Sequence, residues 1–337
     1  MMLQTRKEQK LTNCGKMHKI VILLCVLSLL VAYGAGRESH AESEPSVLVY
    51  EDALGSKIEF SQQELDAIAS ESTKVAVLNG SLAEIWSLAG GKLTAVTEDA
   101  YGGEREIAID DATMNVGSIR NPNVEILLAQ GVEIAILSAD TDSQITFRDK
   151  LEGMGIKTIY LSVETFEDYL SVLGFFTELT GHSDNFETYG VSIAEAIEAQ
   201  MARQDGSHPT VLFLRAYSTG VKAKGSGSMT GIMLKDLGCV NIADGNQRLT
   251  DDLSIEVILE KDPDYIFVTV MGSDEESGLE SVKYLLEDNP AWSSLTAIQE
   301  GHYYVLPANM FHNKPNQRWG ESYQMLADIL YPEQEQS

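Results

Sequence analysis

Residues 123–137 read NVEILLAQGVEIAIL, and they align without a gap on residues 254–268, which read SIEVILEKDPDYIFV. Each copy begins with a residue that favours helix caps and places a glutamate, Glu125 or Glu256, in the first helical turn. An apolar helix face, a turn and a short apolar run typical of a buried strand follow in both copies. The repetition predicts two related α/β units in one chain.

The match extends outward from both copies. Before the first copy, a pattern of strand, helix and strand falls on residues 75–79, 82–90 and 93–99. Before the second copy, the same pattern falls on residues 211–215, 229–238 and 239–244. Further strands are expected at residues 134–137, 157–161, 265–270 and 302–306. Alternating strands and helices form mainly parallel sheets covered by helices, so we predict two doubly wound α/β lobes with a ligand cleft between them.

The flanking and connecting segments have other patterns. Residues 47–50 and 57–60 surround a turn with Gly55 and predict a β-hairpin. Between the lobes, a helix at residues 164–180 precedes a long helix from about residue 183 to about residue 203. A long interlobe helix is a stiff connector, so we expect small lobe motions. The predicted division is a leader or anchor at 1–36, a flexible tether at 37–46, an N-terminal lobe at 47–163, connecting helices at 164–208, a C-terminal lobe at 209–332 and a disordered tail at 333–337.

Charge and composition exclude one large class of function. The chain has 337 residues, 44% of them hydrophobic, and a formal net charge of -27. This length and hydrophobic content suffice for two buried cores. Because nucleic acid requires a dense basic surface, the acidic balance argues against a nucleic-acid partner.

The first 36 residues have the pattern of an export signal. A basic stretch that contains Arg6, Lys7 and Lys10 precedes an almost wholly apolar run at residues 20–35. Small residues at 34–36 and again near Ala41 offer cleavage sites; the alternative is an uncleaved membrane anchor. Either outcome places the rest of the chain outside the cytoplasm.

Cysteine and histidine use argues against a bare metal site. Cys14 and Cys25 lie in the leader, and Cys239 opens a predicted buried strand, where a structural thiol is expected. The six histidines show no paired spacing typical of zinc ligands. A metal that is already wrapped in an organic chelate needs no such protein ligands.

Taken in order, these features resemble the extracytoplasmic substrate-binding proteins of ABC importers, in the class that carries iron(III)-siderophores, haem and cobalamin. The resemblance covers about residues 47–332. It rests on the hairpin, on the long interlobe helix, and on residues 121–125, 254–256, 262–264 and 311–316. It implies a monomeric, non-enzymatic binding protein without a cofactor of its own, which delivers a metal chelate to a permease dimer with ATPase subunits.

The resemblance also implies a docking role for Glu125 and Glu256, one on each lobe, in basic pockets of the permease. Two carboxylates on lobes related by a repeat would form a symmetric pair suited to a two-fold receptor. The alternative is that each only interacts favourably with its helix dipole. One departure concerns Cys25, whose apolar neighbours do not match the lipid-attachment box usual in single-membrane bacteria.

Ligands of doubly wound sheets gather at the carboxyl ends of strands. In the first lobe, the candidate ligand-binding residues at such ends are Asn79, Ser81, Tyr101, Arg120 and Asp140. In the second lobe, they are Arg215, Tyr217, Lys222, Lys224, Met271, Phe311 and His312. Cations are scarce in this chain, so their presence at these loops favours an anionic chelate. The aromatic rings would stack on a planar ligand or pack at the core edge, and His312 would contact a metal or a carboxylate.

The main rival hypothesis is an exported dinucleotide-binding enzyme. The glycine-rich segment 225–231 opens a predicted helix, and Asp244 ends the next strand about twenty residues on. Several residues separate this segment from the strand that ends at Arg215, so the tight strand-to-helix turn is missing. Hydrolase motifs, Gly-x-Ser-x-Gly or His-Glu-x-x-His, are absent from the sequence.

Overall fold

The computed structural model describes residues 48–102, 105–272 and 274–332. They belong to a compact unit that begins at Val47. In this part of the chain, no helix is both long and apolar enough to cross a membrane. The predicted leader at 1–36, tether at 37–46 and tail at 333–337 lie outside the described residues.

The predicted N-terminal hairpin is confirmed. Strands β1 (Leu48–Glu51) and β2 (Lys57–Phe60) pair antiparallel. In the turn, the Asp52 carboxylate accepts the Ser56 backbone N–H at 2.8 Å and pairs with Arg148 at 3.0 Å. The Asp52 side chain is fully buried, so this ion pair ties the hairpin to the first lobe.

The first sheet is parallel, with strand order β5-β4-β3-β6-β7. Its strands are β3 (Val75–Val77), β4 (Ala95–Val96), β5 (Met114–Asn115), β6 (Ile134–Ser138) and β7 (Lys157–Leu161). The apolar runs predicted four of them, because β3, β4 and β6 are wholly buried and β7 nearly so. Strand β5 was not predicted, since both of its residues are exposed at the sheet edge.

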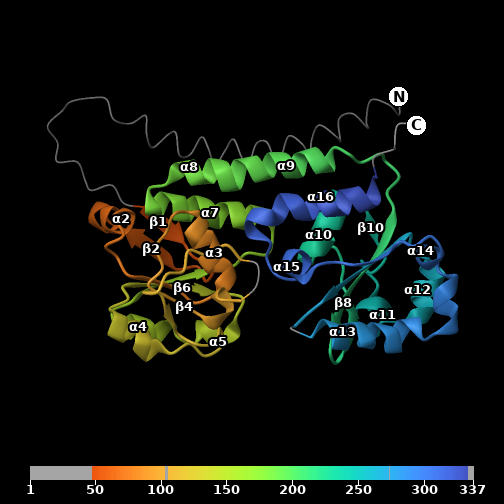
Figure 1. Ribbon diagram of the computed structural model, residues 1–337, viewed down its shortest axis with the longest axis horizontal. Helices are drawn as coiled ribbons and strands as arrows, with labels where there is room; N and C mark the ends of the chain where they lie inside the picture. The colour runs from red at the N-terminus through yellow and green to blue at the C-terminus, as the bar shows by residue number, and fades with distance from the viewer. Residues whose placement is uncertain (1–47, 103–104, 273, 333–337) are drawn as a thin grey trace. The chain divides into compact units, whose positions relative to one another are not determined.

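Helices cover both faces of this sheet (Figure 1). They are α2 (Gln62–Ala69), α3 (Gly80–Leu88), η1 (Glu98–Ala100), α4 (Val124–Gln130), α5 (Asp142–Ile145) and α6 (Arg148–Gly153). On one face, Val124 and Leu127 of α4 join Ala76, Leu78 and Leu137 in an apolar cluster. Burial of such side chains is the main stabilising contribution to the lobe.

The second sheet has strand order β10-β8-β11-β12, all parallel, with β9 antiparallel to β8. Its strands are β8 (Thr210–Tyr217), β9 (Gly220–Ala223), β10 (Val240–Asn241), β11 (Tyr265–Val270) and β12 (Tyr303–Val305). Strand β9 corrects the sequence interpretation, which read Lys222 as a loop residue. Its four residues, GVKA, are too few for the alternation of apolar and polar side chains to predict a strand. The strand is held by its pairing with β8.

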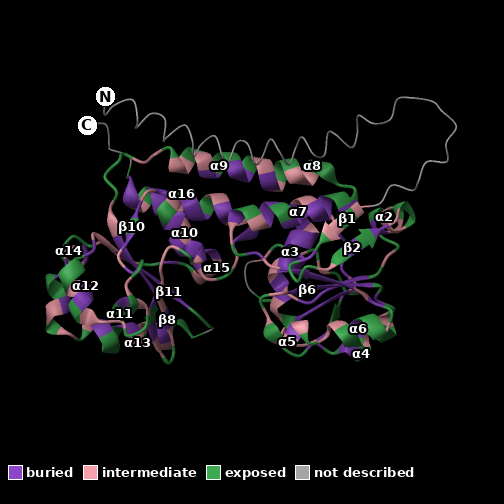
Figure 2. Cartoon of the chain, turned by 180° about the vertical axis from the view of Figure 1, so that it is seen from behind, coloured by how far each residue is buried: buried purple, intermediate pink, exposed green. Residues whose placement is uncertain are grey.

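Shorter helices surround the second sheet, and Figure 2 shows the strands of both sheets as mostly buried. The helices are α10 (Met229–Asp236), α11 (Gln247–Thr250), α12 (Ile255–Lys261), α13 (Glu275–Val282), η3 (Lys283–Glu287), η4 (Pro290–Ser294), α14 (Thr296–Gln299), α15 (Ala308–Phe311), η5 (Asn316–Arg318) and α16 (Trp319–Leu330). The predicted start of the last helix at Trp319 is confirmed.

The two sheets follow the same order, which confirms two related parallel-sheet lobes. Strands β4-β3-β6-β7 of the first correspond to β10-β8-β11-β12 of the second. The repeated stretches form α4 with β6 and α12 with β11. Even the helix ends agree, because the aligned residues Gly131 (φ 68°) and Asp262 (φ 40°) both adopt the left-handed conformation that ends helices.

Helical segments fill the chain between β7 and β8. They are α7 (Phe166–Thr180), α8 (Ser183–Phe186), η2 (Glu187–Val191) and α9 (Ser192–Met201). The last three follow one another without a break, and η2 is a π-helical turn. Helix α8 packs on α7, and α9 packs on α16. Both views show this row of helices along one side of the two sheets (Figures 1 and 2).

Candidate functional site

Two cations stand side by side on the second sheet. Arg215 in β8 is the register partner of Lys222 in β9. Successive strand residues point to opposite faces, and Leu214 and Ala216 belong to the apolar core on one face. Arg215 and Lys222 therefore project from the other face, near the carboxyl end of β8. No ion pair of either side chain occurs in the described part of the chain.

Lys224 extends this cationic group. Its backbone N–H donates to the Phe213 carbonyl at 2.8 Å, and its carbonyl accepts the Asn241 side-chain amide at 2.9 Å. Burial, and then the charges of Arg215 and Lys222, lower the pKa of Lys224. Three cations therefore lie close enough to repel one another, in a chain with a net charge of -27.

His312 lies at the same site. It follows α15, where the Thr230 hydroxyl donates to the Phe311 carbonyl at 2.6 Å. Burial first, and then the charges of Arg215 and Lys314, lower the pKa of His312 to about 4. The imidazole is therefore neutral near pH 7, when it can accept a hydrogen bond or a metal.

Several buried polar atoms here have no hydrogen-bond partner among the residues that the structure describes. They are Nε of Arg215, Oγ1 of Thr269 and Nδ1 of His312. Thr269 in β11 is the register partner of Arg215 in β8, so the two side chains are neighbours on one face. Buried polar atoms are nearly always satisfied, so these mark a place for water or ligand. The sequence analysis missed Thr269, although a lone threonine in the apolar run YIFVTV was a signal.

In the first lobe, the polar side chains near the strand ends mostly form hydrogen bonds within the lobe. Asn79 caps α3 by accepting the Leu82 N–H at 3.1 Å. Asp140 accepts the Ser162 hydroxyl at 2.6 Å. Fully buried Gln144 bonds the Leu78 carbonyl and the Ser138 N–H. Unpartnered buried oxygens remain in this region on Thr97 and Asp99.

The two lobes meet through Asn316. Its side-chain amide donates to the Ser81 carbonyl at 3.0 Å and to the Glu84 carboxylate at 2.6 Å. Glu84 also pairs with Arg105 at 2.9 Å, and its side chain is only 5% exposed. Lys314 of the second lobe also pairs with Glu164, the first residue of the connecting segment, at 2.9 Å in a more exposed link. The sequence analysis assigned Ser81 to the ligand and missed Glu84, whose signal was a charge inside an apolar helix face.

These links border a small hollow of about 60 Å³ between the lobes. Its lining residues come from both lobes: Glu84, Gly102 and Arg105 from the first, and Asn309, Asn313, Lys314, Pro315 and Arg318 from the second. A hollow of this size accommodates water molecules, not a whole chelate.

The remaining predicted ligand residues occupy varied positions. Tyr101 is 46% exposed, and its hydroxyl donates to the Thr113 carbonyl at 3.1 Å. Arg120 and Met271 are exposed, and Tyr217 is half-buried at the end of β8. The Phe311 ring is fully buried, so a ligand would reach it only if α15 moved. The structure thus brings together Arg215, Lys222, Lys224 and His312, and leaves the binding role of all the candidates a prediction.

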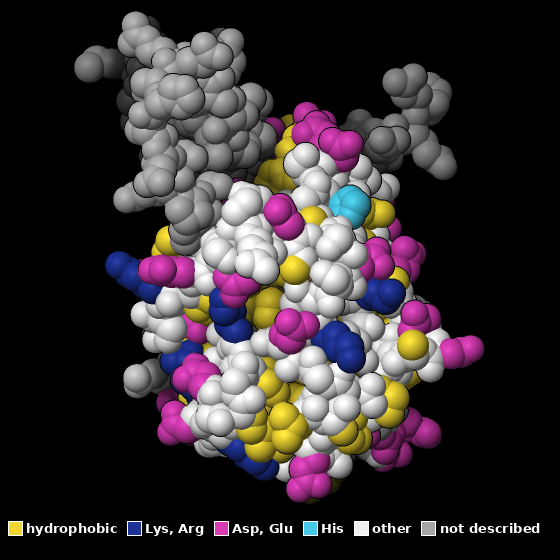
Figure 3. Space-filling model, turned by 90° about the vertical axis from the view of Figure 1, so that its left-hand side faces the viewer, with side chains coloured by type: hydrophobic (Ala, Val, Ile, Leu, Met, Phe, Trp, Pro, Cys, Tyr) yellow, Lys and Arg dark blue, Asp and Glu magenta, His cyan; other side chains and the backbone are white. Residues whose placement is uncertain are grey.

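The two glutamates predicted to dock are both exposed in the first turn of their helices. Their surroundings differ, contrary to the expected symmetry. The Glu125 carboxylate has no ion pair in the described part of the chain, whereas Glu256 pairs with Arg248 at 3.1 Å. Figure 3 views the side of the first lobe, where hydrophobic side chains gather toward the lower end among charged ones.

The glycine-rich segment has a packing explanation. A Cβ on Gly231 would lie 2.2 Å from the Gly225 carbonyl oxygen, and one on Gly225 would lie 2.6 Å from Oδ1 of Asp244. Asp244 is itself engaged, since it accepts the Ser226 N–H at 2.7 Å and hydroxyl at 2.5 Å. Strand β9 also separates this segment from β8. Gly225 and Gly231 are thus required by close contacts within this segment, whereas a side chain at Gly227 would meet open space.

Cys239 is buried, as predicted, and burial raises the pKa of its thiol to about 12. A structural role follows, because the thiolate is the reactive form. Within residues 48–102, 105–272 and 274–332, no cluster of three or more His, Cys, Asp or Glu side chains is arranged to hold a metal ion.

A family model described as periplasmic binding protein matches residues 75–310. Comparison with curated protein sequences finds no match. Among solved structures, the chain is similar to the petrobactin-binding protein YclQ from Bacillus subtilis, with 19% identity, a TM-score of 0.65, and coverage of 86% of this chain and 100% of that one.

Two further structures show the same arrangement. The catecholate-siderophore binding protein VctP from Vibrio cholerae is 17% identical, with a TM-score of 0.64 and coverage of 85% of this chain and 99% of that one. IsdE from S. aureus, solved with haem, is 17% identical, with a TM-score of 0.60 and coverage of 77% and 99%. At these identities the likeness establishes the fold alone.

Proposed function

The chain belongs to the periplasmic binding protein family, and from this premise we propose that it is the substrate-binding component of an ABC importer. The family consists of binding proteins, so the chain is a binding protein and not a dinucleotide-dependent enzyme. Its proposed ligand is an iron(III)-siderophore or a related metal chelate such as haem or cobalamin. Structurally similar proteins are described as binding petrobactin, catecholate siderophore and haem.

The observation that carries this proposal is the cationic group on the second lobe. Arg215, Lys222 and Lys224 have no carboxylate partner among the described residues, and His312 beside them is neutral near pH 7. Ferric siderophores with catecholate or carboxylate arms carry negative charge that such a surface would neutralise. The metal arrives inside its chelate, so it needs no cluster of protein ligands.

We place the ligand between the lobes, at the carboxyl ends of both sheets. In this arrangement the N-terminal lobe (47–163) contributes Asn79, Ser81, Tyr101, Arg120 and Asp140. The C-terminal lobe (209–332) contributes the cations with Tyr217, Met271, Phe311 and His312. The helices at 164–208 act as the stiff connector, so we expect only small lobe motions on binding. X-ray scattering with and without ligand tests this expectation, and a large change in radius of gyration would contradict it.

The proposed cycle ends at the membrane. The protein, exported to the outer face of the cell membrane and acting as a monomer, delivers the chelate to a permease dimer with ATPase subunits. Glu125 and Glu256 are the proposed docking groups. Both are exposed on helices that correspond to each other in the two lobes, which supports this role.

A ligand panel tests the function directly. Trp86, Trp292 and Trp319 are buried in the folded protein, and their fluorescence is measured with a ferric catecholate siderophore, ferric citrate, haemin and cobalamin. We expect saturable quenching and a raised melting temperature with at least one chelate, because binding to the native state alone stabilises it. The iron-free siderophore and a nicotinamide dinucleotide serve as controls. A response to the dinucleotide and to no chelate would refute the proposal.

A further inference from the structure

Corresponding helices in the two lobes begin differently. In the first lobe, the Asn123 side chain caps α4 by accepting the Glu125 N–H at 3.1 Å. In the second lobe, the aligned Ser254 makes no such capping bond to α12. Its hydroxyl instead accepts a hydrogen bond from the Arg248 guanidinium at 3.3 Å.

Arg248 is positioned by the backbone as well. The Ser254 N–H donates to the Arg248 carbonyl at 2.9 Å, which fixes the end of α11 beside the start of α12. From there the guanidinium also pairs with the Glu256 carboxylate at 3.1 Å. The side chain is 59% exposed and that of Glu256 is 82% exposed, so an incoming molecule has access to both groups.

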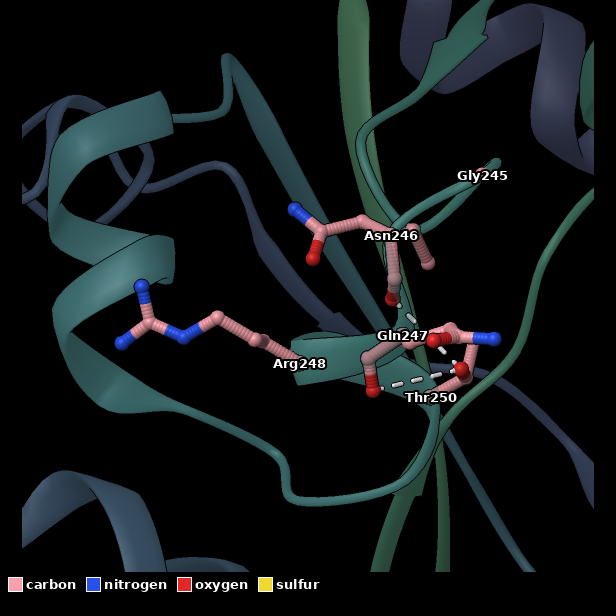
Figure 4. A pocket seen from close by; sticks show the side chains of 6 residues that line it. Gly245, Asn246, Gln247, Arg248 and Thr250 are labelled. Carbon is pink, nitrogen blue, oxygen red and sulfur yellow. Dashed lines mark hydrogen bonds between the residues drawn. The ribbon is translucent and has the colours of Figure 1, made fainter.

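The surface around Arg248 is hollowed. A cavity of about 370 Å³ opens there, lined by Ala243, Gly245, Asn246, Gln247, Arg248 and Thr250. Figure 4 shows the Arg248 guanidinium extended away from Asn246, Gln247 and Thr250 and toward the neighbouring helix. Among the described residues that line this hollow, Arg248 is the one with a charged side chain, and its charge is paired with that of Glu256.

The equivalent place on the first lobe has a glutamate without a paired cation among the described residues. Glu125 is exposed without an ion pair in the described part of the chain, and Leu128, one turn further along α4, is 54% exposed. Leu259, which aligns with Leu128, instead packs against the apolar core of the second lobe. The first lobe thus offers an uncompensated carboxylate beside an apolar side chain.

From these differences, and resting on the proposed function, we infer that the docking surface is unequal. Arg248 screens Glu256, so a permease with basic pockets is held mainly through Glu125 on the first lobe. A basic group of the permease must compete with Arg248 for the Glu256 carboxylate, and the positive charge of Arg248 repels that group. Arg248 is therefore a residue that tunes docking without taking part in ligand capture.

The test measures binding of the full-length protein to its ABC permease complex in lipid nanodiscs, at fixed low ionic strength. Variants are Glu125→Ala, Glu256→Ala, Arg248→Ala and the double variant Arg248→Ala with Glu256→Ala. Lys92→Ala is the matched control, because Lys92 forms a similarly exposed ion pair with Glu71 on the first lobe. Melting temperatures establish that each variant is folded.

We expect Glu125→Ala to weaken binding about tenfold and Glu256→Ala only about two- to threefold. Arg248→Ala should strengthen binding by about 1.5- to 5-fold, the range for an exposed ion pair. In the Arg248→Ala background, loss of Glu256 should cost as much as loss of Glu125. Lys92→Ala should leave binding unchanged.

Two results would overturn the inference while leaving the transport function in place. One is an equal loss from Glu125→Ala and Glu256→Ala in the otherwise unaltered protein. The other is weaker binding by Arg248→Ala, which would mean that Arg248 itself contacts an acid of the permease. If the protein does not bind the complex at all, or if neither glutamate variant changes binding, the proposed docking and this inference fail together.

Discussion

The two lobes share a strand order but differ in what stands at the carboxyl ends of their strands. In the first lobe, the groups there are acids and amides such as Asn79, Asp140 and Gln144, which are engaged in internal hydrogen bonds. In the second lobe, Arg215 and its neighbouring lysines lack carboxylate partners in the described residues.

Among the described residues, unpartnered buried side-chain atoms lie near the strand ends of both lobes. On the first lobe they are oxygens of Thr97 and Asp99. On the second lobe they include nitrogens of Arg215 and His312 and the hydroxyl oxygen of Thr269. The comparison teaches that two corresponding sheets can keep nearly the same strand order while the charged side chains at their strand ends differ.

The largest effect is expected where the lobes touch. Glu84→Ala removes the buried carboxylate that holds Arg105 and Asn316, and the fully buried Asn316 amide, which still donates to the Ser81 carbonyl, loses the acceptor of its shorter hydrogen bond. We expect a loss of about 2–4 kcal/mol in the free energy of unfolding, measured by urea denaturation. Glu164→Ala is the matched control, because it breaks the exposed link to Lys314 and should cost less than about 1 kcal/mol. Equal losses would show that the buried link is not the main contact.

The next effect concerns ligand affinity. Arg215→Gln removes a half-buried cation of the second lobe and should weaken binding of a ferric catecholate siderophore about 10- to 100-fold. Arg120→Gln removes an exposed cation of the first lobe and should weaken it less than about threefold. Isothermal titration of both variants with the siderophore checks which substitution causes the larger loss of affinity. Similar losses would mean that the lobes share recognition equally.

The smallest effect is a pH dependence. The pKa of His312 is lowered to about 4 from its ordinary value of 6.5, by burial and by Arg215 and Lys314. Between these values the unfolded chain binds a proton that the folded chain does not, so stability falls as pH drops from about 6.5 toward about 4. In His312→Gln, the fall in melting temperature over this range should be smaller than in the unaltered protein. His182→Gln, at an exposed histidine, should keep the original profile; coincident profiles for all three proteins would remove His312 from this role.

Much of the fold could be predicted because its signals are local. The buried strands β6, β7 and β11 were evident as short apolar runs, and the repeat placed α4 and α12 in equivalent positions. Strand β9 was missed because it is held by pairing with β8 and not by its own sequence.

The site was less predictable, since its decisive contacts join residues far apart in the chain. Glu84 and Asn316 are separated by 232 positions, and no local sequence pattern around either residue predicts their contact. The pair of Arg248 with Glu256 spans only eight positions, yet it depends on how the turn before α12 folds. Sequence patterns placed the cations at strand ends, and only the packed structure shows which of them remain unpaired.

The π-helical turn η2 (Glu187–Val191) has a geometric consequence for the row of helices above the sheets. A π turn contains about one residue more than an α turn, and one residue corresponds to about 100° of rotation around the axis. Residues after η2 are therefore rotated around the axis relative to their positions in a regular α-helix. Before this turn α8 packs on α7, and after it α9, in which Ile193, Ala194 and Ile197 are buried, packs on α16.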